Sequence, residues 1–365
     1  MVRIAPEHQF VCFVDDVSDH RFPISFPNLR RVRVNLRMAA SEAASAAGYR
    51  APRDMMAMTV AVAREDLDVF FSPSVYTYFL LPPRLPAVVT IHDAIAERFP
   101  LLTVPSRRAR IFWRLKVKAA LLQARRILTV SEYAARDVEN VHGVRRTRID
   151  VAVEAPAASF QPRDTGTVSA EAETVGLPKE TKWFMYVGGF NPHKNIPSIV
   201  RAHAMVAASN PTNPPHLLLV GSIDRDVFHG DLEEIHAAIE TAGTAKLIHW
   251  TGFLPDDRLS ALHSGAVALL LPSAAEGFGL PAVEAAACGT PVIATIESPL
   301  PDLLRDGGIF VKPGDDDALA AAMSRLLDDE GLRARMGKHA LSAASELSWD
   351  SAGRSALNSL KQAVA

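Results

Sequence analysis

Short apolar runs alternate with amphipathic stretches along almost the whole chain, and this alternation restricts the fold more than any other feature. Such runs are typical of strands buried on both faces of a parallel sheet, and each crossover between parallel strands needs a helix. The length of 365 residues fits two such units, because a single core stops growing beyond about 250–300 residues. The sequence therefore predicts an α/β protein with two Rossmann-like domains.

The first half is predicted to hold four strands, at 10–14, 68–72, 87–92 and 126–130, and a helix at 106–123. Polar residues stand at two strand ends, where His92 and Asp93 follow one strand and Ser131 follows another. The second half is predicted to hold five strands, at 183–187, 216–220, 245–250, 267–271 and 291–294, with helices such as 196–208 and 256–263.

Between 150 and 178 the pattern loosens into Ala, Glu, Thr and Pro, which is typical of a connection between domains. We place the boundary near residue 160. The predicted domains are 1–160 and 161–345, followed by a helix at 346–365 that is expected to pack back toward the first domain.

Composition excludes several classes of protein. Lysine and arginine number 39 against 41 acids, so the net charge of -2 gives no electrostatic basis for binding nucleic acid. Two cysteines, Cys12 and Cys288, lie in apolar stretches, which suits a reducing compartment. No apolar run approaches the roughly 18 residues of a membrane span, and no signal peptide is recognisable at 1–10. The sequence predicts a cytoplasmic protein.

The segment 270–295 (LLPSAAEGFGLPAVEAAACGTPVIAT) is the most informative stretch for chemistry. A strand leads through a glycine-containing loop into a helix at Pro281, and Gly289 is expected to cap the end of that helix. The N–H groups at such a helix start form an anion site that suits a diphosphate. Glu284 can accept hydrogen bonds from a ribose diol, and Glu276 lies in the loop before it. The alternative is that this strand, glycine loop and helix form only a structural connection. Two acids around one anion site favour a functional site instead.

These residues carry a resemblance to a known family. Glu276 and Glu284, within EGFGLPAVEAAACGTPVIAT, resemble the signature of the retaining GT-B glycosyltransferases of family 4 (glycosyl transferases group 1), in its mannosyltransferase-like branch. Similar matches to that family are YVGGFNPHKN (186–195), WTGFLPDDRLSALHSGAVALLLPS (250–273), SPLPDLL (298–304), GGIFVKPGD (307–315), VVTIHDAIAERFP (88–100) and ILTVSEYAARDV (127–138). The resemblance implies a GT-B fold, in which two Rossmann-like domains face each other across a cleft.

The resemblance also implies roles for individual residues. Glu276 and His92 would face the transferred sugar and are the predicted catalytic residues, the case for His92 resting on the resemblance. Lys194 would neutralise the diphosphate, whose charge grows as it leaves. Glu284 would bind the ribose. The predicted donor-binding residues are Lys194, Gly189, Gly252, Phe253, Gly277, Phe278, Gly279, Leu280 and Glu284.

The implied reaction is transfer of a hexose, of mannose or glucose type, from a nucleotide sugar to a saccharide or lipid-linked acceptor with retention at the anomeric carbon. GDP-mannose or a UDP-sugar is the expected donor. No cofactor or metal is expected, since the family generally manages phosphate charge without one. The D-x-D pairs are interpreted as surface or loop acids, because spacing alone creates no magnesium site; they are Asp66/Asp68, Asp224/Asp226 and Asp315/Asp317.

The chain departs from the family pattern at three places. Gly189 stands where arginine is common, and His193 where arginine or glutamate is frequent. Members also open with a strand, a glycine-rich loop and a helix before the strand that 10–14 resembles, and only 2 of the 20 glycines precede residue 150. We therefore expect an N-terminally shortened first domain, or a divergent segment that does the same work. The alternative function is a weakly active or non-catalytic nucleotide-binding remnant.

A basic stretch lies between Arg98 and Ser131, where no acidic residue occurs. Its cations at 107–126 are interleaved with large apolar residues, a pattern typical of helices that lie on anionic lipid. The alternative is a helix packed on the sheet with its cationic face in water. Peripheral contact with the inner face of the membrane is therefore one of two interpretations of this stretch.

Overall fold

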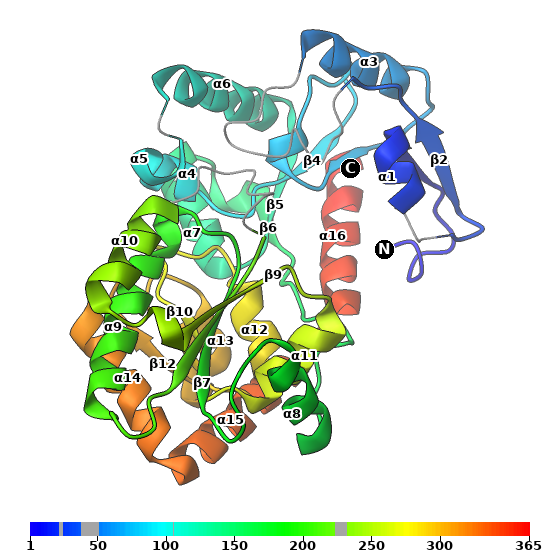
Figure 1. Ribbon diagram of the computed structural model, residues 1–365. Helices are drawn as coiled ribbons and strands as arrows, with labels where there is room; N and C mark the ends of the chain where they lie inside the picture. The colour runs from blue at the N-terminus through cyan, green and yellow to red at the C-terminus, as the bar shows by residue number, and fades with distance from the viewer. Residues whose placement is uncertain (22–24, 38–50, 105, 223–231) are drawn as a thin grey trace. The chain divides into compact units, whose positions relative to one another are not determined.

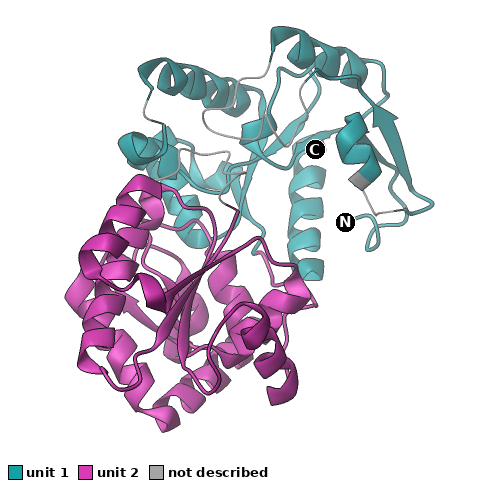
Figure 2. Cartoon of the chain, in the orientation of Figure 1, with its two compact units in different colours: residues 1–153, 349–365 teal, residues 154–348 magenta. Residues whose placement is uncertain are grey.

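The computed structural model describes residues 1–365 except 22–24, 38–50, 105 and 223–231 (Figure 1). The chain divides into two compact units, and Figure 2 distinguishes unit 1, residues 1–153 and 349–365, from unit 2, residues 154–348. The sequence prediction had placed this division near 160 and the start of the last segment at 346. Each unit is an α/β domain with parallel sheets, which confirms the predicted fold class.

Unit 2 is built on a parallel sheet with the strand order β12-β11-β10-β7-β8-β9. In chain order this is the 3-2-1-4-5-6 arrangement of doubly wound domains. The prediction of five strands was one short, because the short strand that begins at Gly308 was not counted. The strands are β7 (Trp183–Val187), β8 (His216–Val220), β9 (Ile248–Gly252), β10 (Ala268–Leu271), β11 (Val292–Thr295) and β12 (Gly308–Val311).

Helices cover both faces of this sheet, as βαβ crossovers require. On one side α10 and α14 each contact α9, and on the other α8, α11, α12 and α15 are linked by contacts. Every residue of β8 and β10 is buried, which explains their continuous apolar sequence. The helices are α8 (Thr165–Thr174), α9 (Ile196–Ser209), α10 (Leu232–Ala242), α11 (Asp256–Gly265), α12 (Leu280–Ala287), α13 (Leu300–Leu304), α14 (Asp316–Asp328) and α15 (Glu330–Ser345).

Unit 1 holds a parallel sheet in the order β3-β4-β5-β6 and a separate parallel pair, β1 and β2. Strands β2 and β6 were not predicted. The strands are β1 (Phe10–Val14), β2 (Leu29–Arg33), β3 (Phe70–Ser72), β4 (Ala87–Thr90), β5 (Arg126–Thr129) and β6 (Ile149–Val151). The helices are α1 (Asp16–Arg21), α3 (Pro52–Ala63), α4 (Ile95–Arg98), α5 (Pro100–Thr103), α6 (Arg107–Gln123), α7 (Glu132–His142) and α16 (Trp349–Val364).

Helix α16 closes unit 1 from the far end of the chain. It packs on β4, β5 and β6, and its small residues allow a close approach to the sheet. Arg125 also donates a hydrogen bond from Nη1 to the carbonyl oxygen of Ala363 at 2.9 Å. The buried cluster beneath the helix consists of Val88, Leu128, Ala152, Ala352, Ala356 and Ala363. Among the described residues, no helix combines the length and apolar character needed to cross a bilayer.

Candidate functional site

The chain order of the unit 2 sheet reverses between β7 and β10, which lie side by side at its centre. Ligands of open parallel sheets bind outside the carboxyl ends of the strands at such a reversal. Two segments leave the sheet there: 188–195 follows β7, and 272–279 follows β10 and leads into α12. These are the segments in which the sequence placed Lys194 and Glu276.

Lys194 and Glu276 form an ion pair between these two segments. Lys194 Nζ lies 2.8 Å from Glu276 Oε1, which also accepts a hydrogen bond of 2.6 Å from Ser273 Oγ. The Glu276 side chain is 9% exposed and that of Lys194 is 21% exposed. Because both side chains are largely shielded from solvent, this charge-assisted hydrogen bond fixes their positions. The structure thus joins the residues predicted to meet the sugar and the diphosphate.

Hydrogen bonds to backbone carbonyl groups hold the same two segments together. The Ala274 N–H donates to the carbonyl oxygen of His193 at 2.8 Å, and Asn195 Nδ2 donates to the carbonyl oxygen of Pro272 at 3.3 Å. Asn195 adopts a left-handed conformation with φ of 59°, which ends a 3-10 turn at 192–194 and lets α9 begin at once. Lys194 is therefore positioned by backbone on both sides.

Helix α12 begins directly after the glycine loop. Gly279 has φ of 88°, and a Cβ atom there would lie 2.8 Å from the Leu300 side chain, so the turn requires glycine. The helix starts at Leu280, one residue before the predicted Pro281. Gly289 follows the last turn with φ of 78°, as expected of a glycine at a helix end.

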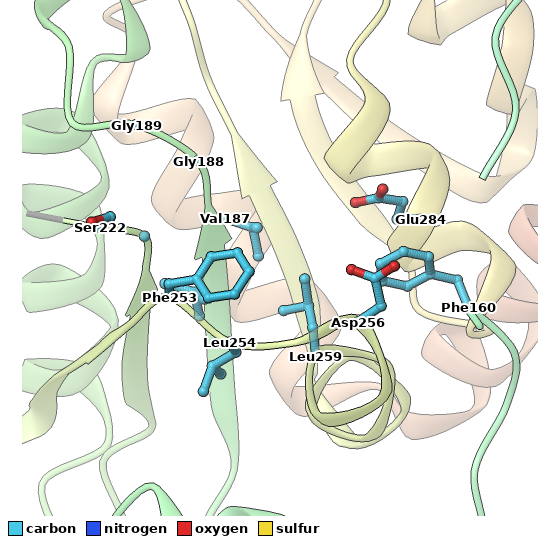
Figure 3. A pocket seen from close by; sticks show the side chains of 12 residues that line it. Phe160, Val187, Gly188, Gly189, Ser222, Phe253, Leu254, Asp256, Leu259 and Glu284 are labelled. Carbon is cyan, nitrogen blue, oxygen red and sulfur yellow. The ribbon is translucent and has the colours of Figure 1, made fainter. Parts of the chain in front are cut away.

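A pocket of about 330 Å³ lies beyond the carboxyl ends of β7, β8 and β9. Figure 3 shows Phe253 and Glu284 on either side of Val187 at the end of β7. Three glycines, Gly188, Gly189 and Gly221, line it, and a Cβ on Gly221 would stand only 2.1 Å from the carbonyl oxygen of Gly188. The lining residues are Phe160, Val187, Gly188, Gly189, Val220, Gly221, Ser222, Phe253, Leu254, Asp256, Leu259 and Glu284.

Glu284 is the titratable group of this pocket that is most perturbed. Burial, and after it the nearby charges of Asp256 and Glu154, raises the pKa of its carboxyl from 4.5 to about 7. A carboxyl with this pKa changes its hydrogen-bonding character close to neutrality: ionised, it accepts from two hydroxyls at once, as a ribose diol offers.

The predicted donor-binding residues fall into four groups. Gly189, Phe253 and Glu284 line the pocket, and Lys194 pairs with Glu276. Gly252 ends β9 with φ of 69°, directly before Phe253. The rest occupy the loop and first turn before Glu284, where Phe278 is buried at 4% exposure; they are Gly277, Phe278, Gly279 and Leu280.

Four pocket residues lie outside every motif that the sequence had matched to the family: Phe160, Val220, Gly221 and Ser222. Gly221 and Ser222 directly follow the strand at 216–220, so a glycine at a strand end was an available signal. Phe160 comes from the connecting segment, and nothing in its local sequence indicates that it reaches a pocket.

His193, one of the departures from the family pattern, precedes Lys194 in the 3-10 turn. Burial, then the charge of Lys194, lowers the pKa of this histidine to about 4, against an opposing effect of Glu276. Its Nδ1 atom is buried and has no hydrogen-bond partner among the described residues. The residue therefore adds a neutral imidazole beside the ion pair at neutral pH.

His92, the other predicted catalytic residue, belongs to unit 1, two residues after β4. Burial lowers its pKa, and the charge of Asp93 opposes that effect. Asp93 Oδ1 accepts from the Ile95 N–H at 2.9 Å and so supports the start of α4. Ser131, at the end of β5, caps α7 by accepting from the Ala134 N–H at 2.9 Å. Of the three polar residues at these two strand ends, Ser131 is thus a helix N-cap, and Asp93 supports the start of a helix.

The D-x-D pairs have various surroundings. Asp315 caps α14 by accepting from the Ala318 N–H at 2.9 Å. Asp66 and Asp68 lie in the segment before β3, and Asp224 and Asp226 lie outside the described residues. Within the part of the chain that the structure describes, no three His, Cys, Asp or Glu side chains are grouped so as to hold a metal ion.

Two family models match the chain in succession. The Glycosyltransferase Family 4 model matches residues 8–152, and the Glycosyl transferases group 1 model matches residues 169–342. The O-antigen chain mannosyltransferase B of Escherichia coli is 29% identical over 78% of this chain and 72% of its own length. The D-inositol 3-phosphate glycosyltransferase of Acidothermus cellulolyticus is 31% identical over 77% of this chain, which spans 63% of that relative.

Solved structures share the fold at low sequence identity. A sucrose-phosphate synthase of Thermosynechococcus elongatus aligns with a TM-score of 0.72 at 22% identity, covering 93% of this chain and 84% of that one. WaaG, a glycosyltransferase involved in lipopolysaccharide biosynthesis, aligns with a TM-score of 0.72 at 14% identity over 96% and 99%. Anabaena HepE, solved with UDP and glucose, aligns with a TM-score of 0.67 at 18% identity over 91% and 86%.

Proposed function

Since this chain belongs to the family 4 glycosyltransferases of the GT-B fold, we propose that it transfers a hexose from a nucleotide diphosphate sugar to a saccharide or a lipid-linked saccharide. The observation that carries the proposal is the ion pair between Lys194 and Glu276 at the reversal point of the unit 2 sheet. The first of the two segments that hold the pair also supplies Gly188 and Gly189 to the pocket, and the second leads into α12, which supplies Glu284.

In this proposal the nucleoside occupies the pocket, with Glu284 accepting hydrogen bonds from the ribose. The diphosphate meets Lys194 and the N–H groups at the start of α12, which stabilise the charge that develops on the leaving group. Glu276 accepts hydrogen bonds from the transferred sugar. His92 is the proposed catalytic residue of unit 1, and the anomeric configuration is retained.

The donor is GDP-mannose or a UDP-sugar, and transfer needs neither metal nor cofactor. The similarity to a mannosyltransferase supports the first donor, and the likeness to a structure solved with UDP and glucose is compatible with the second. The enzyme works in the cytoplasm, and a lipid-linked acceptor brings it to the inner face of the membrane.

A panel of nucleotide sugars tests the proposal by release of UDP or GDP, with mixed saccharide and lipid-linked acceptors. We expect one donor to turn over equally with and without EDTA, and NMR of the product to show the donor's anomeric configuration. Glu276→Ala and Lys194→Ala serve as loss-of-function variants. Thermal stabilisation by nucleotide without turnover of any donor would contradict transfer and favour a nucleotide-binding role.

A further inference from the structure

Strands β1 and β3 of unit 1 each have a partner on one side only. Strand β1 pairs in parallel with β2, and β3 pairs in parallel with β4. Among the described residues, no strand pairs with the other edge of either. Phe13 of β1 and Phe70 of β3 nevertheless contact each other, with ring centroids 6.3 Å apart. The two unpaired edges therefore lie near each other, and we call them the open edges of β1 and β3.

Each open edge presents backbone groups that the existing partner strand cannot reach. The N–H groups of Phe10 and Phe70 donate to carbonyl oxygens just before β2 and β4, so these residues face their partner strands. Backbone polar groups alternate in direction along a parallel strand, so those of Val11, Phe13 and Phe71 face the open edges. No hydrogen bond joins the N–H groups of these three residues to another residue that the structure describes.

The side chains of β1 and β3 suit strands with neighbours on both sides. Strand β1 reads FVCFV, yet four of its five residues are only half-buried, whereas every residue of β4 (AVVT) is buried. Phe70 and Phe71 of β3 are half-buried as well. Strand β2, on the outer side of β1, reads LRRVR and has the charged residues of a protected edge. The open edges carry no such charges, so they are apolar templates for a further strand.

Unit 2 shows which element occupies the corresponding place in a continuous sheet. From one edge its strands run β9-β8-β7-β10-β11-β12, and those of unit 1 run β2-β1 and then β3-β4-β5-β6. The chain order reverses at this place in both units. Helix α3 connects β2 to β3 and contacts β1, as a crossover between parallel strands does. Among the described residues, no strand of unit 1 corresponds to β7, which is parallel to both of its neighbours.

We propose that the open edges of β1 and β3 bind one extended apolar segment of a separate polypeptide, parallel to both strands. The backbone of that segment exchanges hydrogen bonds with Val11 and Phe13 on one side and with Phe71 on the other. Strands that flank a third strand lie about 10 Å apart, and the Phe13 and Phe70 rings can meet across that space and cover one face of the segment. The proposal does not depend on the proposed hexose transfer.

The chemistry of the bound segment follows from its place. A strand between two parallel neighbours is covered on both faces, so it is apolar at successive positions instead of alternating with polar residues. In unit 2, β7 reads WFMYV, and its first four residues are buried. We therefore expect a segment of about five apolar residues, rich in β-branched side chains and without proline.

Residue-resolved amide hydrogen exchange of the full chain tests the proposal. The probe peptide KKTVIVVKK carries a β-branched core between lysines that keep it soluble, and in the control peptide KKTVPVVKK proline removes a central donor. Without peptide, the amides of Val11, Phe13 and Phe71 should exchange at least about 100-fold faster than those of Phe10 and Phe70. The probe peptide should slow the exchange of the first three at least about tenfold, and the control peptide should not.

A pair of proline variants locates the bound peptide. Val11→Pro removes a donor of the open edge of β1 and leaves the bonds between β1 and β2 in place, which proline at a strand edge allows. It should weaken binding of the labelled probe peptide, measured by fluorescence anisotropy, at least about tenfold. Val151→Pro is the matched control, because Ala152 donates to β5 and Val151 therefore faces the outer edge of β6. It should leave binding unchanged, and thermal melting shows that both variants fold.

Three results would overturn the proposal. The first is slow exchange of the Val11, Phe13 and Phe71 amides without peptide, which would show that the open edges are already paired. The second is no protection of these amides by the probe peptide. The third is binding that Val11→Pro and Val151→Pro weaken equally. A concentration-dependent dimer that protects the same amides would overturn the choice of partner and assign the open edges to a second copy of this chain.

Discussion

In unit 2 the buried Glu276 is paired with a cation, whereas in unit 1 the half-buried Glu97 accepts a hydrogen bond from a neutral indole. Glu276 lies 2.8 Å from the ammonium of Lys194, while Glu97 accepts from Trp113 Nε1 at 2.7 Å. Burial raises the pKa of the Glu97 carboxyl to about 7. The two acids therefore suit different work: Glu276 holds in place the cation that engages a phosphate in the proposed function, and the bond of Glu97 to the indole joins α4 to α6.

The largest effect is expected from breaking the ion pair of unit 2. Lys194→Ala should lower kcat about 10²- to 10³-fold, because the charge of the leaving diphosphate loses its preorganised cation. It should also lower the free energy of unfolding, since a carboxylate at 9% exposure loses its partner. Steady-state kinetics and thermal unfolding measure the two effects.

Adding Glu276→Gln to Lys194→Ala should restore part of the lost stability but none of the turnover. Lys246→Ala, at an exposed position of unit 2, is the matched control and should change neither. If Lys194→Ala kept full turnover with the preferred donor, the ion pair would be structural only, and the contrast between the two units would lose its functional meaning.

The next largest effect is expected from a substitution at Gly221, one of the glycines that line the pocket. Gly221→Ala should destabilise the chain by about 3 kcal/mol, because the new Cβ would meet the carbonyl oxygen of Gly188 at 2.1 Å and backbone yields little. Gly331→Ala is the control, since its Cβ would meet only the flexible Arg335 and Asp329 side chains at 3.4 Å. Chemical denaturation compares the two, and equal stability would show that the strand ends separate easily.

Much of unit 2 was predictable because its strands can be recognised from short stretches of sequence. Fully buried parallel strands are continuous apolar runs, so β7, β8 and β10 stand out in the sequence. In unit 1, β2 reads LRRVR and β6 has three residues, so neither shows a buried-strand pattern. The hydrogen bond between Glu97 and Trp113 joins residues 16 positions apart that only tertiary packing brings together. No sequence motif predicts it.

The same distinction holds within the candidate site. Glu276 and Glu284 belong to one continuous motif, so the sequence could predict that they act on one ligand. Phe160 reaches the pocket only because the connecting segment folds onto α11, where Ser260 Oγ accepts from the Gln161 N–H at 3.3 Å. Such a contact depends on the assembled unit, and its residues carry no signal of their own.

A smaller effect should appear as a pH dependence of donor binding. The pKa of Glu284 is raised to about 7, so its carboxyl is protonated below that pH and offers the ribose one acceptor fewer. Affinity for a nucleotide sugar, whose phosphates do not titrate near neutrality, should therefore rise up to about tenfold between pH 6 and 8. Calorimetric titration measures it.

Glu284→Gln should bind weakly at every pH and lose this dependence. A raised pKa in the folded state also means that the contribution of Glu284 to stability is complete below pH 4.5 and is lost as the pH rises through 7. The variant should therefore show a flatter stability profile in that window. An unchanged affinity profile in the variant would contradict a role for Glu284 in binding the ribose.

The smallest effect is expected in unit 1, from Trp113→Phe. The indole N–H lowers the pKa of Glu97 against the larger effect of burial, so it favours the ionised carboxyl. Loss of this hydrogen bond should lower the free energy of unfolding by about 1 kcal/mol. The decrease should be larger at pH 8.5, where the carboxylate is ionised, than at pH 5.5.

Trp349→Phe, at a tryptophan of unit 1 that is 52% exposed, is the matched control and should cost little at either pH. A cost of Trp113→Phe that is equal at both pH values would mean that ring packing against Tyr76, at a centroid distance of 4.8 Å, dominates over the bond to Glu97. In that case the indole would stabilise α6 by contact alone. The acid of unit 1 would then have no part in joining α4 to α6.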